Sequence, residues 1–252
     1  MSHVRTDVSG GVAKITLDRP PLNILTIAML TELGHALRDA ANKEGVHALV
    51  LCGEGKGFSA GVDIREHLPE TIEAMLAAVH DALMAVLDAP VPVVAAVHGP
   101  CLGGGMEVAM AADLVYAADD ATFGQPEIQL GVFPPFAAAL YPSWFGRARA
   151  AELVLLGETM SAKDAFARGL VTGVVPAAEL TAKVDAVCAK LAALSPSSLR
   201  IAREALRLGG SHRPVALPAV EALYRDKLMK TEDAREGLAA FLEKRAPKWR
   251  GH

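Results

Sequence analysis

The sequence predicts an α/β fold, in which buried strands alternate with helices. Three observations lead to this prediction. Nearly all-apolar runs of strand length occupy residues 46–51, 91–97 and 114–116. Between these runs, apolar residues recur at the spacing of a helix, and glycine and proline separate the two kinds of segment. Strands that are apolar at almost every position are typical of parallel sheets covered on both faces, and not of sandwiches.

The first elements are a hairpin and an amphipathic helix. Residues 12–17 alternate between apolar and polar side chains, and Val8 precedes them across Gly10-Gly11, as in a hairpin. Thr26 is a candidate helix N-cap. Apolar residues then recur with helical period as far as about Lys43, which predicts one helix with a buried face.

The later elements become mainly helical. We expect helices over residues 70–88 and 106–112, and beyond Gly146 we expect four further helical regions: 147–156, from Ser161, after Pro176, and 197–244. Ser and Pro at residues 195–198 and Gly-Gly-Ser at 209–211 mark a boundary. The sequence is therefore divided into a core at residues 1–195 and a helical C-terminal segment at residues 196–252.

Composition excludes several classes of function. The chain has 252 residues and a formal net charge of −4, without a cluster of Lys and Arg, so nucleic acid is not an expected partner. Cys52, Cys101 and Cys188 are odd in number and far apart, which argues against disulfides and zinc and favours a reducing cytoplasm. The N-terminus has no signal-peptide pattern, and no apolar stretch of about 20 residues predicts a membrane segment.

Two glycine-rich turns form a weak internal repeat. Residues 46–61 and 91–105 each run from an apolar strand through a glycine-rich turn into a helix. If the strands are parallel neighbours, both turns lie at the sheet edge where α/β proteins bind ligands. Two backbone N–H groups could then hold one oxygen as an oxyanion hole, where each donor is typically worth roughly 2.7 to 4 kcal/mol. The alternative for either turn alone is a purely structural role.

Two carboxylates are candidates for acid–base chemistry. Glu107 lies in an otherwise apolar helical segment, and Glu127 follows Pro126 on a loop after the third apolar strand. Burial raises the pKa of a carboxyl toward neutrality, where it can donate or accept a proton. The alternatives are a Glu107 paired with a basic residue and a Glu127 that is an ordinary turn carboxylate. The sequence contains no phosphate-binding loop, serine-nucleophile elbow or H-E-x-x-H metal motif.

Several motifs occur together and in the order of one known family. They are ITLDRP at 15–20, GFSAGVDI at 57–64, HGPCLGGGME at 98–107, ADLVYA at 112–117, FGQPE at 123–127 and FLEKR at 241–245. On these motifs the chain resembles the crotonase, or enoyl-CoA hydratase/isomerase, superfamily. The resemblance implies a spiral of β-β-α units, a helical C-terminal trimerisation segment, and a homotrimer or dimer of trimers.

The resemblance also implies an acyl-CoA substrate and a set of site residues. The amides of Val62 and Gly104 match the two oxyanion donors, and Glu107 and Glu127 match the hydratase acids. The positions that match CoA-binding residues are Leu22, Ala60, Ile64, Phe241 and Lys244. Coenzyme A is then part of the substrate, and neither a metal nor another cofactor is expected.

Two acids favour hydration, in which Glu107 deprotonates water and Glu127 protonates the α-carbon. An enoyl-CoA isomerase, a thioester hydrolase and a non-catalytic CoA-binding protein remain alternatives. The chain departs from the common hydratase pattern at Val62, which is bulkier than the usual alanine, and at residues 131–139, where Phe133, Pro135 and Phe136 replace a Gly-Gly-Thr helix start. In this stretch it resembles cyclohexa-1,5-diene-1-carbonyl-CoA hydratases, so the acyl group is either linear or a cyclic diene.

Overall fold

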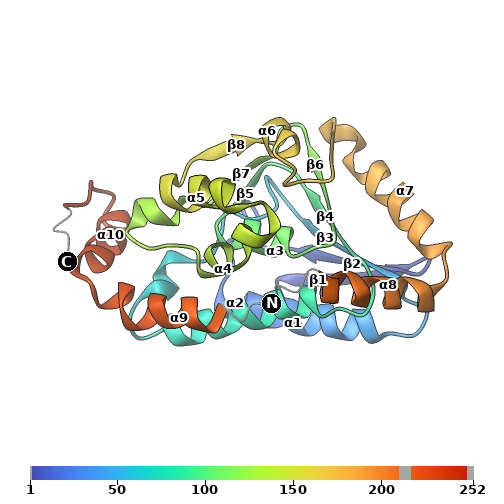
Figure 1. Cartoon of the computed structure of the whole chain (residues 1–252), viewed down its shortest axis with the longest axis horizontal. Coiled ribbons are helices and arrows are strands. Elements are labelled where there is room, and N and C mark those ends of the chain that lie inside the picture. Colours follow the sequence, from blue (N-terminus) through green and yellow to red (C-terminus); the bar gives the residue numbers. More distant parts are fainter. Residues whose placement is uncertain (1, 210–216, 249–252) are drawn as a thin grey trace.

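Two sheets organise the chain in the computed structural model, which describes residues 2–209 and 217–248 (Figure 1). The larger sheet has the strand order β1-β2-β3-β4-β6-β9, and only its first pair, β1 and β2, is antiparallel. Its strands are β1 (Val4–Ser9), β2 (Val12–Leu17), β3 (Ala48–Gly53), β4 (Val93–Val97), β6 (Leu114–Ala118) and β9 (Gly173–Val175). The smaller sheet, in the order β5-β7-β8, consists of β5 (Pro100–Leu102), β7 (Thr122–Gly124) and β8 (Thr159–Ser161).

The two sheets are linked by a repeated β-β-α path. Strand β4 of the larger sheet leads to β5 of the smaller one and then to helix α3 (Gly104–Met110). Strand β6 leads in the same way to β7 and to the 3₁₀ helix η2 (Pro126–Leu130). The expected α/β spiral of β-β-α units is confirmed.

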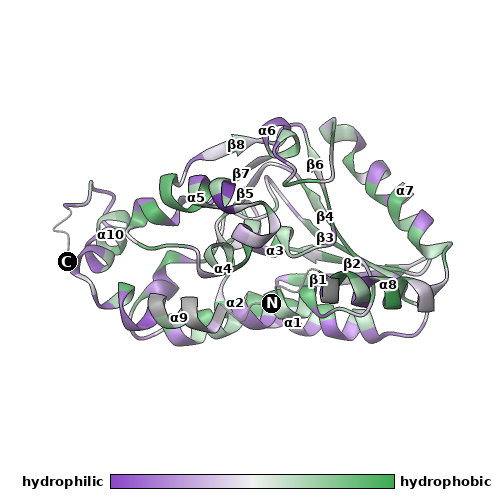
Figure 2. Cartoon of the chain, viewed as in Figure 1, coloured by the Kyte–Doolittle hydropathy of each residue, from purple (hydrophilic) through white to green (hydrophobic). Residues whose placement is uncertain are grey.

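Helices cover both faces of the larger sheet, which explains its nearly all-apolar strands. Helix α1 (Ile27–Asn42) begins at the expected N-cap, where the Thr26 hydroxyl accepts a hydrogen bond from the Met29 amide, and it packs with α2 (Ile72–Leu87). On the other face, Val50 and Val94 pack against α7 (Leu180–Ala192). Figure 2 shows hydrophobic and hydrophilic residues along both α1 and α7, as expected for helices with one buried and one exposed face.

The region after β7 differs from the sequence prediction in three elements. Helix α4 (Pro135–Trp144) was not expected; it starts with proline at its first position, where the missing N–H costs no hydrogen bond. The expectation of mainly helices beyond Gly146 is right for α5 (Arg147–Leu156) and α6 (Ala162–Ala167). It did not include β8 and β9, because strands of three residues are too short to show a period.

The C-terminal segment contains α8 (Pro196–Gly209), α9 (Leu217–Asp226) and α10 (Glu232–Leu242). Tyr224, Met229 and Leu238 belong to the same apolar core as the strands, so α9 and α10 pack onto their own chain. Residues 210 and 211 of the expected Gly-Gly-Ser boundary lie outside the described residues. None of the described helices has the length and hydropathy of a membrane span.

Candidate active site

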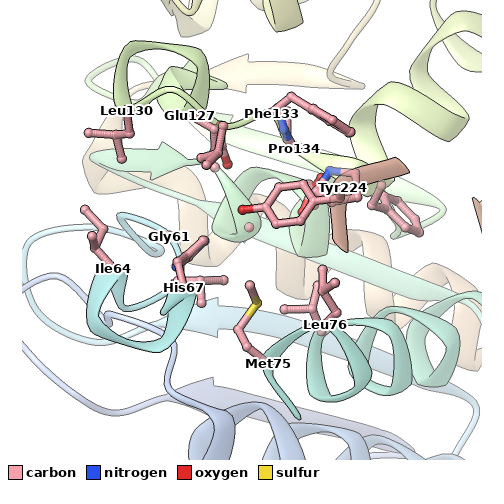
Figure 3. Close-up of a pocket in the computed structure, with 18 of the residues that line it drawn as sticks. Gly61, Ile64, His67, Met75, Leu76, Glu127, Leu130, Phe133, Pro134 and Tyr224 are labelled. Atoms are coloured by element: carbon pink, nitrogen blue, oxygen red, sulfur yellow. The ribbon is translucent and has the colours of Figure 1, made fainter. Parts of the chain in front are cut away.

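A cavity of about 370 Å³ opens between the two glycine-rich turns, α2, η2 and the C-terminal helices (Figure 3). It brings together most of the residues that the sequence singled out. The predicted residues on its wall are Ala60, Val62, Ile64, Gly104, Glu107, Glu127 and Phe241. Leu22 and Lys244 do not line this cavity. Leu22 lies directly behind the wall, because its carbonyl accepts the Ala60 amide at 2.9 Å.

The two turns lie side by side because β3 and β4 are parallel neighbours. The backbone of Ser59 is paired with β5: its amide donates to the Pro100 carbonyl at 3.1 Å, and its carbonyl accepts the Leu102 amide at 2.9 Å. Behind the first turn, the fully buried amide of Asn23 donates to the carbonyls of Glu54, Gly57 and Phe58. These contacts hold the first turn against the second.

The Val62 and Gly104 amides lie at neighbouring places on the cavity wall. A Cβ atom built on Gly104 would lie 3.8 Å from the Val62 nitrogen, and one built on Gly61 would lie 3.8 Å from the Gly104 nitrogen. Gly104 is the first residue of α3, so its N–H has no acceptor within the helix. Neither N–H donates to another described residue, which leaves both available to a ligand.

Glu107 is buried and is held by the N-terminus of another helix. Its side chain is on the first turn of α3 and is 3% exposed. The Ala137 amide donates to its Oε1 at 2.8 Å, and the Phe136 amide donates to the same carboxylate. Burial raises the pKa of Glu107 to about 7, although the two amides favour the charged form. The stretch at residues 131–139 therefore does more than line the cavity, because it positions one of the acids.

Glu127 faces the same cavity, and the backbone donor to its carboxylate is its own amide, not the N-terminus of another helix. Its carboxylate lies against Gly103, where an added Cβ would come within 2.5 Å of Oε1, and its Oε2 is buried without a hydrogen-bond partner among the described residues. Burial, followed by the negative charge of Glu107, raises the pKa of Glu127 to about 8. Two buried carboxyl groups, of which Glu107 is the more readily ionised, thus line the same cavity as the two free amides.

Comparison with known proteins places this chain in a family. The model of the enoyl-CoA hydratase/isomerase family matches residues 7–252. The chain belongs to this family. A cyclohexa-1,5-dienecarbonyl-CoA hydratase of Thauera aromatica is 41% identical over 95% of this chain and 93% of its own length. A probable enoyl-CoA hydratase of Bacillus subtilis (strain 168) is 38% identical over the full length of both chains.

A solved structure shows the same fold over the whole chain. An enoyl-CoA hydratase from Mycobacterium avium subsp. paratuberculosis K-10 superposes with a TM-score of 0.88 at 32% identity, and 99% of each chain is covered. The prediction of an enzyme of the enoyl-CoA hydratase type agrees with these relatives.

Sequence reasoning missed parts of the cavity wall in this family member. Tyr224 of α9 and His67 of the 3₁₀ helix η1 (Ile64–His67) both line it. The His67 Nδ1 lies 3.1 Å from the Asp63 carbonyl, and burial lowers the pKa of this imidazole, so it stays neutral. No local motif marks Tyr224, because only the return of α9 over α2 and α4 brings it to the cavity.

Proposed function

We propose that the protein adds water reversibly to an α,β-unsaturated acyl-CoA thioester. One observation carries this proposal: two buried glutamates and two unoccupied backbone amides face a single cavity. Amide donors can bind a thioester carbonyl that gains negative charge, while acids with pKa values near neutrality can move protons. Family membership supports the same chemistry.

In the proposed reaction the thioester carbonyl accepts hydrogen bonds from the amides of Val62 and Gly104. Glu107, the more readily ionised acid, takes one proton from a water molecule. The water oxygen bonds to the β-carbon, and the π electrons of the double bond move into the enolate that the two amides stabilise. Glu127 then gives its proton to the α-carbon. Return of one proton from Glu107 to Glu127 restores the site, so the net change is the addition of one water.

The order of the two pKa values supports these roles. Glu107 receives two amide hydrogen bonds, which favour its charged form, so it is the better base. Glu127 receives a hydrogen bond from its own amide, but burial and the charge of Glu107 outweigh it, so Glu127 is the better acid at neutral pH. No cofactor besides the coenzyme A of the substrate takes part in this scheme.

The proposal is tested by product analysis in water enriched in heavy oxygen. The wild-type protein is incubated with crotonyl-CoA and with the cyclic dienoyl-CoA ester. Hydration places the label in a new hydroxyl group, thioester hydrolysis places it in a free acid, and isomerisation places it in neither. Labelled hydroxyacyl-CoA is expected; labelled free acid, unlabelled isomer or no product would contradict hydration.

We further propose that the acyl group is a cyclic diene. Much of the cavity wall is apolar, and it includes Leu76, Leu83, Phe133, Pro135 and Phe136. The 41% identical relative is named for hydration of such an ester. Steady-state kinetics should give a higher kcat/KM for cyclohexa-1,5-diene-1-carbonyl-CoA than for crotonyl-CoA. A large preference for crotonyl-CoA would overturn the cyclic assignment and leave hydration intact.

The coenzyme A portion is proposed to extend from the cavity past Ala60, Ile64 and Phe241. Lys244 follows α10 and supplies the positive charge that the phosphates need in a chain of net charge −4. Leu22 supports the first turn from behind. A homotrimer or dimer of trimers remains part of the proposal, and sedimentation of the purified protein tests it.

A further inference from the structure

The Tyr224 side chain closes the cavity from the C-terminal segment. Tyr224 is 1% exposed, and its ring meets the Phe133 ring edge-on, with centroids 5.2 Å apart. Figure 3 shows the phenol between Glu127 and Phe133 on one side and Met75 and Leu76 on the other. One helical turn before it, Glu221 meets Nδ1 of His80 on α2 at 2.9 Å, which fastens α9 over the cavity.

The Tyr224 hydroxyl has no hydrogen-bond partner among the described residues. Tyr224 lines the cavity, so this hydroxyl can hydrogen-bond a ligand or a water molecule that enters it. Burial and the charges of Glu127 and Glu107 hold the pKa of the phenol far above its ordinary value. The hydroxyl therefore stays protonated, and it can donate or accept a hydrogen bond but cannot act as a base.

The surroundings of Tyr224 limit what it can bind. The charges that act on its phenol are those of Glu107 and Glu127, and the apolar neighbours Phe133, Met75 and Leu76 offer no hydrogen bonds. In the proposed reaction the thioester carbonyl is bound by the two backbone amides. The remaining oxygen that enters this space is that of the added water, which becomes the hydroxyl of the product.

We propose that Tyr224 is a catalytic residue, whose hydroxyl hydrogen-bonds the attacking water and then the new hydroxyl group of the product. This inference rests on the proposed hydration. Water has two O–H groups: Glu107 takes the proton of one, and Tyr224 accepts a hydrogen bond from the other without taking its proton. Tyr224 thereby fixes the direction from which water approaches the β-carbon, and no proton is gained or lost at the phenol.

The test compares Tyr224→Phe with Tyr116→Phe. The chain has three tyrosines, and Tyr116 lies on β6 beneath Lys183, away from the cavity, so its variant controls for loss of a phenol hydroxyl. Tyr224→Phe is expected to lower kcat/KM for hydration roughly 10-fold or more, with an unchanged melting temperature. Tyr116→Phe should hydrate at the wild-type rate. A Tyr224→Phe variant with the wild-type rate would overturn the proposal.

A binding measurement separates this role from simple packing. Affinities for 3-hydroxybutyryl-CoA and butyryl-CoA are measured by titration calorimetry in the Glu107→Gln variant, in which turnover is suppressed. If the cyclic ester is the preferred substrate, the corresponding cyclic esters with and without the hydroxyl group are used. Adding Tyr224→Phe should weaken binding of the hydroxylated ligand roughly 10-fold. The affinity for the ligand without the hydroxyl group should change by less than about two-fold. Equal effects on both ligands, or none, would overturn the role. Absence of hydration by the wild-type protein would instead refute the proposed function, so the two failures are distinguishable.

Discussion

Two parts of the molecule bury charged side chains in opposite ways. Arg203 of α8 is 4% exposed and is well paired: it donates to Asp113 at 2.7 Å and to the carbonyls of Val86, Leu87 and Ala89 at the end of α2. In the cavity, Glu107 and Glu127 would carry the same charge if both were ionised, and Glu127 has an oxygen without any partner among the described residues.

The comparison separates a structural use of burial from a functional one. A cation at the C-terminus of a helix satisfies carbonyls that would otherwise lack donors, so Arg203 stabilises the packing of α8 on α2. The two glutamates do the reverse, because their ionised forms are destabilised by burial and by each other. Such an arrangement is expected where pKa values are set for catalysis.

The largest expected effect is on turnover. Glu107→Gln and Glu127→Gln should each lower kcat for hydration by about 10³-fold, because each removes one partner in proton transfer. The glutamine Oε1 can still accept the Ala137 amide in the first variant, so its fold should remain intact. Steady-state rates and circular dichroism of both variants check this. Either variant with near wild-type turnover would remove that glutamate from the mechanism.

The comparison also shows what a sequence can predict. The α/β class, helix α1 and the adjacent turns follow from local periodicity and glycine spacing, and Glu107 stood out because its neighbours are apolar. The unpaired carboxylate oxygen of Glu127 could not be predicted, since a polar side chain after Pro126 is ordinary on a turn. The roles assigned to these acids and to the Val62 and Gly104 amides stay predictions until the variants are measured.

Contacts between distant segments left no signal in the sequence. The amides of Phe136 and Ala137 reach Glu107 only because α4 begins beside α3, and Arg203 meets Asp113 only because α8 packs across the end of α2. Tyr224 likewise reaches the cavity only through the packing of α9 on α2 and α4. Each depends on how helices pack in three dimensions, which a periodic pattern does not encode.

The second effect is a loss of stability when the paired charge of Arg203 is removed. Arg203→Ala should lower the free energy of unfolding by about 3 kcal/mol, since it leaves carbonyls at the end of α2 without donors and opens a cavity. Chemical denaturation measures the loss. Turnover at low temperature should stay within a few-fold of wild type, because Arg203 does not line the active-site cavity. A stability loss below about 1 kcal/mol would show that the pairing is dispensable.

The third effect is on the pH dependence of stability, to which Glu107 and Glu127 contribute because burial raises the pKa of both. Their pKa values rise from 4.5 to about 7 and about 8 on folding, so between these limits the native state binds more protons than the unfolded state. Their contribution to the free energy of unfolding therefore falls as pH rises from about 4.5 to about 8. The double variant Glu107→Gln/Glu127→Gln should gain at least about 2 kcal/mol over wild type between pH 5 and pH 8. A constant difference across this range would contradict the raised pKa values.

The smallest effect isolates the position of Glu127. Gly103→Ala would place a Cβ 2.5 Å from Glu127 Oε1, so the carboxyl must move, whereas Gly146→Ala meets no atom within 4 Å. Both glycines stand directly before a helix and have a positive φ, 51° at Gly103 and 84° at Gly146. Both variants should therefore lose about 1 to 3 kcal/mol of stability through backbone strain. Only Gly103→Ala should also lower kcat, by roughly 10-fold, because a displaced acid transfers protons less efficiently. Equal kcat values in the two variants would mean that proton transfer does not depend on where the Glu127 carboxyl is held.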